Sequence, residues 1–111
     1  MKVKDIMTKN VKTCSSDTDL AAAVQLMWEN NCGIVPVIDD EGKPIGVITD
    51  RDIAVAVATR NKLAGEVKVG EVMAGEVFSC DPNEDVKSAL VTMKTSRVRR
   101  LPVVDNKSRK L

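Results

Sequence analysis

Apolar and polar positions form two different patterns along the chain, and each pattern occurs twice. Short apolar runs without charges, at 34–38 and 101–104, predict buried strands. Longer segments, with apolar residues three and four positions apart, predict two amphipathic helices, one in each half of the chain. The apolar positions of these helices are Leu20, Ala23, Val24 and Met27 in the first, and Val86, Ala89, Leu90 and Met93 in the second.

Each predicted helix is preceded by a short strand pattern, at 11–14 and 77–80. Ser16 and Asp19 resemble a capping box for the first helix. In the second copy, 81–84 offers a cap, a proline suited to the first helical position and an acid for the first turn. We therefore expect helix starts at both places.

A proline interrupts each apolar run, at Pro36 and Pro102. Because proline has no backbone N–H, it implies an edge position or a local irregularity at which no ladder hydrogen bond is lost. After the first run, the polar turn at 39–44 leads into a further strand and helix at 45–58.

The junction at 45–53 is the most informative stretch of the chain. Thr49 and Asp50 can cap the helix that follows, and the start of a helix directs N–H groups and a positive dipole end towards an anion such as phosphate. Asp52 adds two acceptor oxygens that suit the hydroxyls of a ribose. The alternative is that Asp50 and Asp52 only cap the helix and complement its dipole.

The two halves of the chain are related by an internal repeat. Residues 3–45 align with 69–111 without a gap, at a constant shift of 66 positions. Such self-similarity indicates a duplicated structural unit. We expect a first repeat at 1–60, a linker at 61–68 and a second, incomplete repeat at 69–111, because the counterpart of 46–53 is not found before residue 111.

Composition narrows the possible functions. The 111 residues carry a net charge of +1, which gives no reason to expect nucleic acid or an anionic membrane as a partner. The chain has no histidine and no tyrosine, so histidine-based catalysis and imidazole metal sites are excluded. Three cysteines without C-x-x-C spacing argue against a disulfide framework and favour a reducing, cytoplasmic setting.

The repeated β-α-β-β-α pattern resembles a pair of CBS (cystathionine β-synthase) domains. The resemblance rests on the apolar strands with proline and a closing acid, 35–39 and 101–105, and on the Gly-Val-Ile-Thr-Asp-Arg-Asp-Ile stretch at 46–53. It covers essentially the whole chain, which is similar to small stand-alone bacterial or archaeal CBS-pair proteins. It implies an α/β (α+β) fold of tandem repeats related by a pseudo-two-fold axis.

CBS pairs sense adenosine-containing ligands such as AMP, ADP, ATP or S-adenosylmethionine, and they usually regulate another protein. In that family, a Thr/Ser-x-x-Asp motif of one copy and the opening segment and strand of the other form a cleft. The resemblance implies one such cleft here, with phosphate and ribose held by the Thr-x-x-Asp motif. Its residues would be Val47, Ile48, Thr49, Asp52, Val72, Met73, Val77, Val98, Arg99, Arg100 and Pro102.

The basic cluster at Arg97, Arg99 and Arg100 has two interpretations. Arginine forks match phosphate oxygens, so one of them could serve a phosphate in the cleft. Because side chains alternate along a strand, we expect only one of Arg99 and Arg100 to face it. The alternative is a solvated basic surface.

Three functions compete at this point. We expect a regulatory module that needs no cofactor, takes an adenosine nucleotide as its ligand and forms a homodimer, with apolar strand edges near Val103 and Leu111 left for another chain. The alternative is a dimerisation module without a bound nucleotide. An enzyme is not expected, because no nucleophile–base pair and no phosphate-binding glycine motif is present.

Cys14 and Cys80 should be buried as small apolar residues, and Trp28 should lie at a partner interface.

Overall fold

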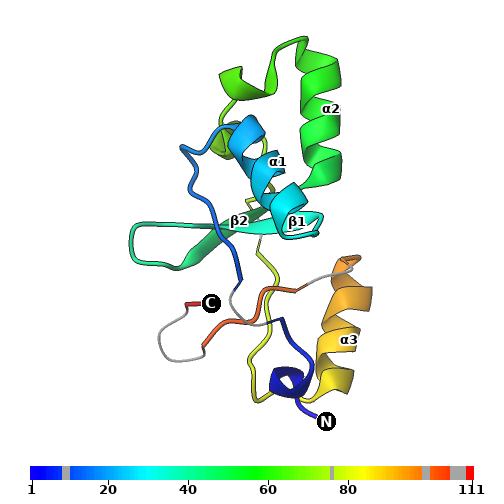
Figure 1. The fold of residues 1–111 in the computed structure, drawn as a ribbon. Helices are drawn as coiled ribbons and strands as arrows, with labels where there is room; N and C mark the ends of the chain where they lie inside the picture. The colour runs from blue at the N-terminus through cyan, green and yellow to red at the C-terminus, as the bar shows by residue number, and fades with distance from the viewer. Residues whose placement is uncertain (9–10, 76, 99–100, 106–109) are drawn as a thin grey trace. The chain divides into compact units, whose positions relative to one another are not determined.

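The structure, a computed structural model, describes residues 1–8, 11–75, 77–98, 101–105 and 110–111. It divides into two compact units, which we describe separately (Figure 1). The hairpin unit is Lys12–Val77, and the terminal unit combines Met1–Val11 with Phe78–Leu111. The mixture of helices and short strands confirms the predicted α+β fold.

The hairpin unit consists of a two-stranded sheet with two helices packed against it. β1 (Ile34–Ile38) and β2 (Pro44–Thr49) pair antiparallel. Figure 1 shows α1 (Leu20–Glu29) and α2 (Asp50–Arg60) side by side above this hairpin. Two short 3₁₀ helices follow, η2 (Ala64–Glu66) and η3 (Val69–Glu71).

Pro36 lies where its missing N–H costs nothing, as the sequence predicted. It is paired with Val47, whose N–H and carbonyl bond with Ala74 on the other side of β2. The Pro36 carbonyl likewise points away from β2 and accepts from the Cys14 N–H at 3.1 Å. The pair therefore occupies a position without hydrogen bonds between the two strands, where proline is tolerated.

The expected first strands, at 11–14 and 77–80, are not strands of several residues. Each is reduced to a single bridge, Cys14 with Val37 and Cys80 with Val103. Both cysteines are buried, as predicted, with 7% of each residue exposed.

The predicted helix starts are wrong in both copies, because neither the Ser16–Asp19 capping box nor the cap at 81–84 forms. Asp19 itself caps α1 by accepting from the Ala22 N–H at 2.8 Å, and Asp85 caps α3 (Val86–Ser96) in the same way through the Lys87 N–H. The residues before each cap form turns because their carbonyls accept from another segment. For example, Glu84 accepts from the Val3 N–H at 2.9 Å.

The core of the hairpin unit is built mainly from α1, the two strands and the segment after α2. Val24 was expected in this core but is 42% exposed, and its counterpart Leu90 on α3 is 55% exposed. Val24 lies beyond the narrow stripe of α1 that the small two-stranded sheet can cover. Val67, from the predicted polar linker, is buried. The largest fully buried side chains among the described residues are Leu20, Val35, Val37, Ile48, Val67 and Val69.

The terminal unit repeats the hydrogen bonds of the hairpin unit. Its elements are η1 (Val3–Asp5) and α3, and it has the smaller core, made of Val3, Cys80 and Ala89. The Val86 N–H bonds to the Met1 carbonyl at 3.0 Å, just as the Leu20 N–H bonds to the Val67 carbonyl at 2.9 Å. Donors and acceptors of the two bonds are each related by the shift of 66 positions. The opening segment of each repeat is thus bonded to the helix start of the other repeat, and the duplication extends to individual backbone bonds.

The helices in the described parts of the chain are short. The longest, α2 and α3, have 11 residues each, about half of the roughly 20 that a bilayer crossing requires. None of them is long and apolar enough to span a membrane.

Candidate functional site at the β2–α2 junction

The Thr49–Asp52 motif forms a complete capping box. The Thr49 Oγ1 accepts from the Asp52 N–H at 3.1 Å, and the Asp52 Oδ2 accepts from the Thr49 N–H at 3.1 Å. Both residues are half-buried. These bonds fix the rotamers of Thr49 and Asp52, the two residues predicted to bind a ligand. They also show that both residues cap α2, which was the alternative interpretation.

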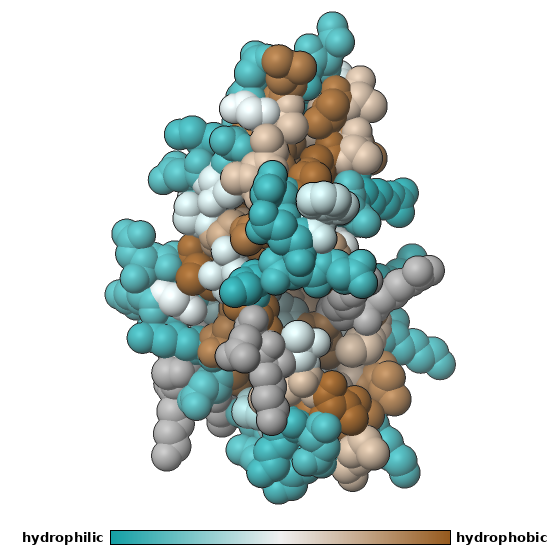
Figure 2. Space-filling model, viewed as in Figure 1, coloured by the Kyte–Doolittle hydropathy of each residue, from teal (hydrophilic) through white to brown (hydrophobic). Residues whose placement is uncertain are grey.

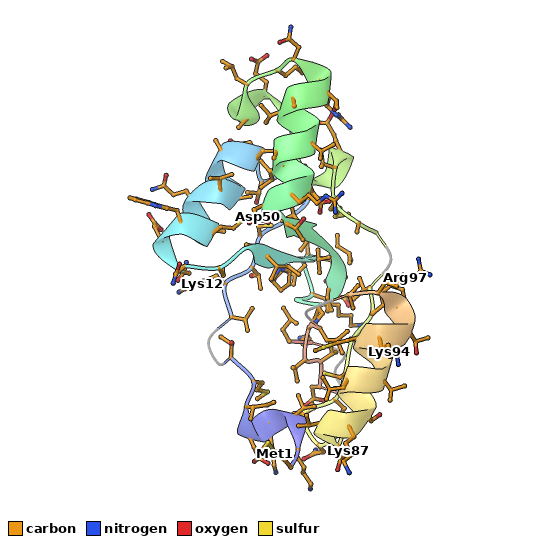
Figure 3. All side chains as sticks on the ribbon, turned by 90° about the vertical axis from the view of Figure 1, so that its right-hand side faces the viewer. Met1, Lys12, Asp50, Lys87, Lys94 and Arg97 are labelled. Carbon is orange, nitrogen blue, oxygen red and sulfur yellow. The ribbon has the colours of Figure 1, made fainter. Side chains whose placement is uncertain are left out.

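The first N–H groups of α2 already have acceptors. The Asp50 N–H bonds to the Gly33 carbonyl at 3.0 Å, and the Arg51 N–H bonds to the Asp50 Oδ1 at 2.8 Å. The third, at Asp52, bonds to Thr49 as described. Asp50 stands directly where β2 passes into α2 (Figure 3). A phosphate at this point would have to displace these acceptors and approach two aspartates.

Asp52 keeps one oxygen available. Its Oδ2 is used by the capping box, whereas no described residue donates a hydrogen bond to Oδ1. The side chain lines a shallow groove of about 280 Å³ between α2 and η3. A half-buried carboxylate oxygen without a donor is suited to accept hydrogen bonds from hydroxyl groups.

Most of the groove was not identified from the sequence. Within it, the Arg60 Nη1 lies 3.5 Å from the Glu71 Oε1, and the Arg60 Nη2 donates to the Glu71 carbonyl at 3.2 Å. The lining residues of α2 after Asp52 follow it at intervals of three and four positions, so they share its face of the helix. This spacing could have identified the face from the sequence. The lining residues are Arg51, Asp52, Val55, Ala56, Thr59, Arg60, Glu71 and Val72.

The opening segment of the second repeat lies beside β2 in this unit. Val47 and Ala74 exchange two backbone hydrogen bonds, of 3.1 and 3.0 Å. Val72 and Met73 are half-buried and pack against the core. A Cβ at Gly46 would lie 2.9 Å from the Met73 Sδ. Val47, Val72 and Met73 thus lie in the same unit as the capping box, and Val72 lines the groove together with Asp52.

The remaining predicted site residues are placed differently. Ile48 is fully buried and belongs to the core. Val77 is half-buried at the end of the hairpin unit, and Val98 and Pro102 are half-buried in the terminal unit. Arg99 and Arg100 fall outside the described residues.

The thiols of the two buried cysteines, Cys14 and Cys80, have raised pKa values. Burial raises the pKa of the Cys14 thiol. Burial, followed by the negative charges of Glu84 and Asp81, raises the pKa of the Cys80 thiol. Both therefore remain protonated thiols near neutral pH. Among the residues that the structure describes, no three His, Cys, Asp or Glu side chains gather in a way that could hold a metal ion.

Comparison with known proteins identifies the family. The model of the CBS domain matches residues 3–59 and 69–111. The chain belongs to the CBS-domain family. Two CBS matches, one for each repeat, agree with the duplicated hydrogen bonds. The exact boundaries expected for the repeats, 1–60 and 69–111, remain a prediction.

Relatives of the chain include both stand-alone and embedded CBS pairs. It is 39% identical over 103 residues to the CBS domain-containing protein YhcV of Bacillus subtilis, covering 93% of this chain and 72% of that protein. It is 33% identical over 108 residues to inosine-5′-monophosphate dehydrogenase of Methanocaldococcus jannaschii, covering 97% of this chain but 21% of the enzyme. The similarity to the enzyme thus concerns only about a fifth of its length.

The fold is similar to solved CBS pairs. The CBS domain pair of protein MJ0100, solved in complex with 5′-methylthioadenosine and S-adenosyl-L-methionine, matches with a TM-score of 0.89 and 30% identity. The match covers 100% of this chain and 85% of that one.

Proposed function

We propose that this CBS pair is a regulatory module that binds an adenosine-containing ligand (AMP, ADP, ATP or S-adenosylmethionine). The observation that carries the proposal is the Asp52 carboxylate, held by the capping box with one oxygen left for a ligand. The similarity to a CBS pair that binds 5′-methylthioadenosine and S-adenosyl-L-methionine supports the same class of ligand.

In this proposal, Asp52 accepts hydrogen bonds from the ribose hydroxyls. Thr49 positions the aspartate and adds its own hydroxyl at the start of α2. Val47, Val72 and Met73 provide apolar contacts from the hairpin unit. The contributions of Val77, Val98 and Pro102, and a phosphate contact from Arg99 or Arg100, remain predictions.

Within this class, the charges near the junction favour a ligand without a polyphosphate. The first N–H groups of α2 have acceptors already, and Asp50 and Asp52 place negative charge at the point where phosphate was predicted. S-adenosylmethionine carries a sulfonium cation, which these carboxylates would attract. We therefore expect S-adenosylmethionine to bind more tightly than ATP.

The test is calorimetric titration of AMP, ADP, ATP and S-adenosylmethionine into the parent chain and into Asp52→Asn. Asparagine can still cap the helix but loses the charge-assisted acceptor, which should weaken binding roughly tenfold to a hundredfold. Asp17→Asn makes the same charge change at an exposed site beside Lys68 and serves as the control. Unchanged affinity in Asp52→Asn would show that this residue only caps α2.

We infer that the module has no catalytic activity of its own. The chain contains no histidine, and its described residues present no nucleophile with an adjacent base. A sensing role requires only that the ligand binds the folded state, which it then stabilises by mass action.

We also propose that the chain forms a homodimer through α1. Trp28 is 82% exposed, and Ala21, Val24 and Gln25 share its face of the helix, whose only charged residue is Glu29. Figure 2 shows apolar surface on the helices of the hairpin unit. In an antiparallel two-fold arrangement, each Trp28 ring can lie on the small Ala21 of the other copy, so the face complements itself.

Light scattering tests the homodimer. The parent should have twice the mass of one chain, and Trp28→Lys should be monomeric. Val91→Lys introduces the same charge at an exposed apolar position on α3 and should leave the mass unchanged. A monomeric parent at high concentration would exclude the dimer.

A further inference from the structure

The groove beside Asp52 changes its chemistry along α2. All of its lining residues belong to the hairpin unit. Asp52 and Arg60 both line it, and they are separated by about 12 Å along the helix axis, at 1.5 Å per residue. Val55 and Ala56 lie between them on α2 and line the groove as well. A ligand that follows the helix from Asp52 therefore meets a carboxylate, then apolar side chains, then a guanidinium.

Arg60 is paired with an acid from η3. Its Nη1 lies 3.5 Å from the Glu71 Oε1, and its Nη2 donates to the Glu71 carbonyl at 3.2 Å. The other carboxylate oxygen of Glu71, Oε2, accepts from the Lys68 N–H at 2.8 Å. Each of the two charged side chains is thus held by a backbone group, and the cation and the anion stand side by side in the groove.

This pairing leaves bonding capacity on both side chains. The separation of Nη1 and Oε1 is longer than the roughly 2.7–2.9 Å of a charge-assisted hydrogen bond. The Arg60 and Glu71 side chains are 39% and 48% exposed, and an ion pair at such a site adds little to stability. No described residue accepts a hydrogen bond from the Arg60 Nε–H. The guanidinium therefore keeps donors, and the Glu71 Oε1 keeps lone pairs, for a ligand.

We propose that Arg60 and Glu71 form a subsite for the α-amino-acid group of S-adenosylmethionine. The inference rests on the adenosine site proposed at Asp52 and extends that site along the groove. The carboxylate of the ligand binds the Arg60 guanidinium, and its ammonium group binds the Glu71 carboxylate. The methionine carbon chain lies over Val55 and Ala56.

The paired charges distinguish among the adenosine ligands. AMP, ADP and ATP carry only anionic groups beyond the ribose, which Arg60 attracts and Glu71 repels. S-adenosylmethionine carries a carboxylate and an ammonium group on the same carbon, so a neighbouring cation and anion complement both. The pair therefore favours an amino acid over a phosphate at this end of the groove.

The test compares three ligands that differ in this group. S-adenosylmethionine and S-adenosylhomocysteine both carry the amino acid, the second without the sulfonium charge, and 5′-methylthioadenosine lacks it. Calorimetric titration into the whole chain should show that S-adenosylhomocysteine binds roughly tenfold more tightly than 5′-methylthioadenosine. Because neither of these two has a sulfonium, the difference reports on the amino acid alone.

Two variants assign the difference to the ion pair. Glu71→Gln and Arg60→Met each remove one charge and keep most of the side-chain length. Each should weaken both ligands that carry the amino acid roughly fivefold and leave 5′-methylthioadenosine unchanged. Glu41→Gln removes the same charge from an exposed pair with Lys43 in the turn between β1 and β2, outside the groove, and is the matched control. It should change the affinity of none of the three.

Three results would overturn the proposal. Equal weakening of all three ligands by the variants would show that the pair only holds η3 against α2. Unchanged affinity for all three would show that the amino acid does not contact the pair. Binding of free L-methionine as tight as that of S-adenosylmethionine, and unaffected by Asp52→Asn, would indicate a separate amino-acid site.

Failure of this subsite is distinguishable from failure of the adenosine site. If 5′-methylthioadenosine binds the parent and is weakened by Asp52→Asn, the adenosine site stands whatever the variants of Arg60 and Glu71 do. If the parent binds none of the three ligands, the adenosine site and the subsite are both refuted.

Discussion

Gly46 is the position where the hairpin unit tolerates no side chain. A Cβ there would lie 2.6 Å from the Ala74 carbonyl oxygen and 2.9 Å from the Met73 Sδ. The methionine could move, but the carbonyl belongs to the backbone that bonds to Val47. Gly46→Ala should therefore separate the opening segment of the second repeat from β2.

The expected cost follows from two contributions. Overpacking of a buried site typically costs about 1–3 kcal/mol. Loss of the two Val47–Ala74 hydrogen bonds adds about 0.5–1.5 kcal/mol each. We therefore expect Gly46→Ala to lower the free energy of unfolding by about 3 kcal/mol, which corresponds to a drop in Tm of roughly 12–24 °C for a domain of this size.

Urea denaturation followed by far-ultraviolet circular dichroism is the suitable assay. Trp28 is too exposed for its fluorescence to report well on folding. Gly65→Ala is the matched control, since nothing lies within 4 Å of a Cβ at that position. It should leave the stability unchanged or raise it by less than about 1 kcal/mol.

A second variant locates the origin of the cost. Met73→Ala combined with Gly46→Ala removes the sulfur contact but not the carbonyl contact, so it should not restore stability. If Gly46→Ala changes the free energy of unfolding by less than about 0.5 kcal/mol, or if Met73→Ala restores it, the close backbone approach is not what requires glycine here.

Two further predictions concern the terminal unit and the thiols. The pKa values of the Cys14 and Cys80 thiols are raised in the folded state. The contribution of these thiols to the free energy of unfolding is therefore fully present below the unfolded thiol pKa, about 8.5. It is lost as the pH rises through the folded pKa values. Tm should therefore fall above about pH 8.5, and the double variant Cys14→Ala and Cys80→Ala should reduce that slope; an equal slope would contradict the assignment. The buried Glu84 Oε2 has no hydrogen-bond partner among the described residues, so Glu84→Thr, which installs the residue of the other copy, should raise the free energy of unfolding by about 1 kcal/mol. It should also lower the pKa of Cys80 but not that of Cys14, as followed by mass spectrometry of alkylation rates against pH.

The features that could be predicted from the sequence depend on neighbouring residues or on the repeat. The apolar run at 34–38 is β1 to the residue, and Thr49 caps α2 as its spacing to Asp52 predicts. Cys14 and Cys80 are buried at equivalent places. These outcomes follow from residue type, periodicity and self-similarity, all of which are properties of a short stretch or of a comparison of the chain with itself.

The tertiary structure decided what depends on distant segments. Ser16 could not be excluded as a cap from the sequence, because only the fold shows its carbonyl bonded to the N–H of Gly70. The exposure of Val24 follows from the small area of the sheet, which helical spacing does not contain. Likewise, the open oxygen of Asp52 is set by which partners other elements supply. A local pattern specifies the groups that can bond, and the fold determines which of them do.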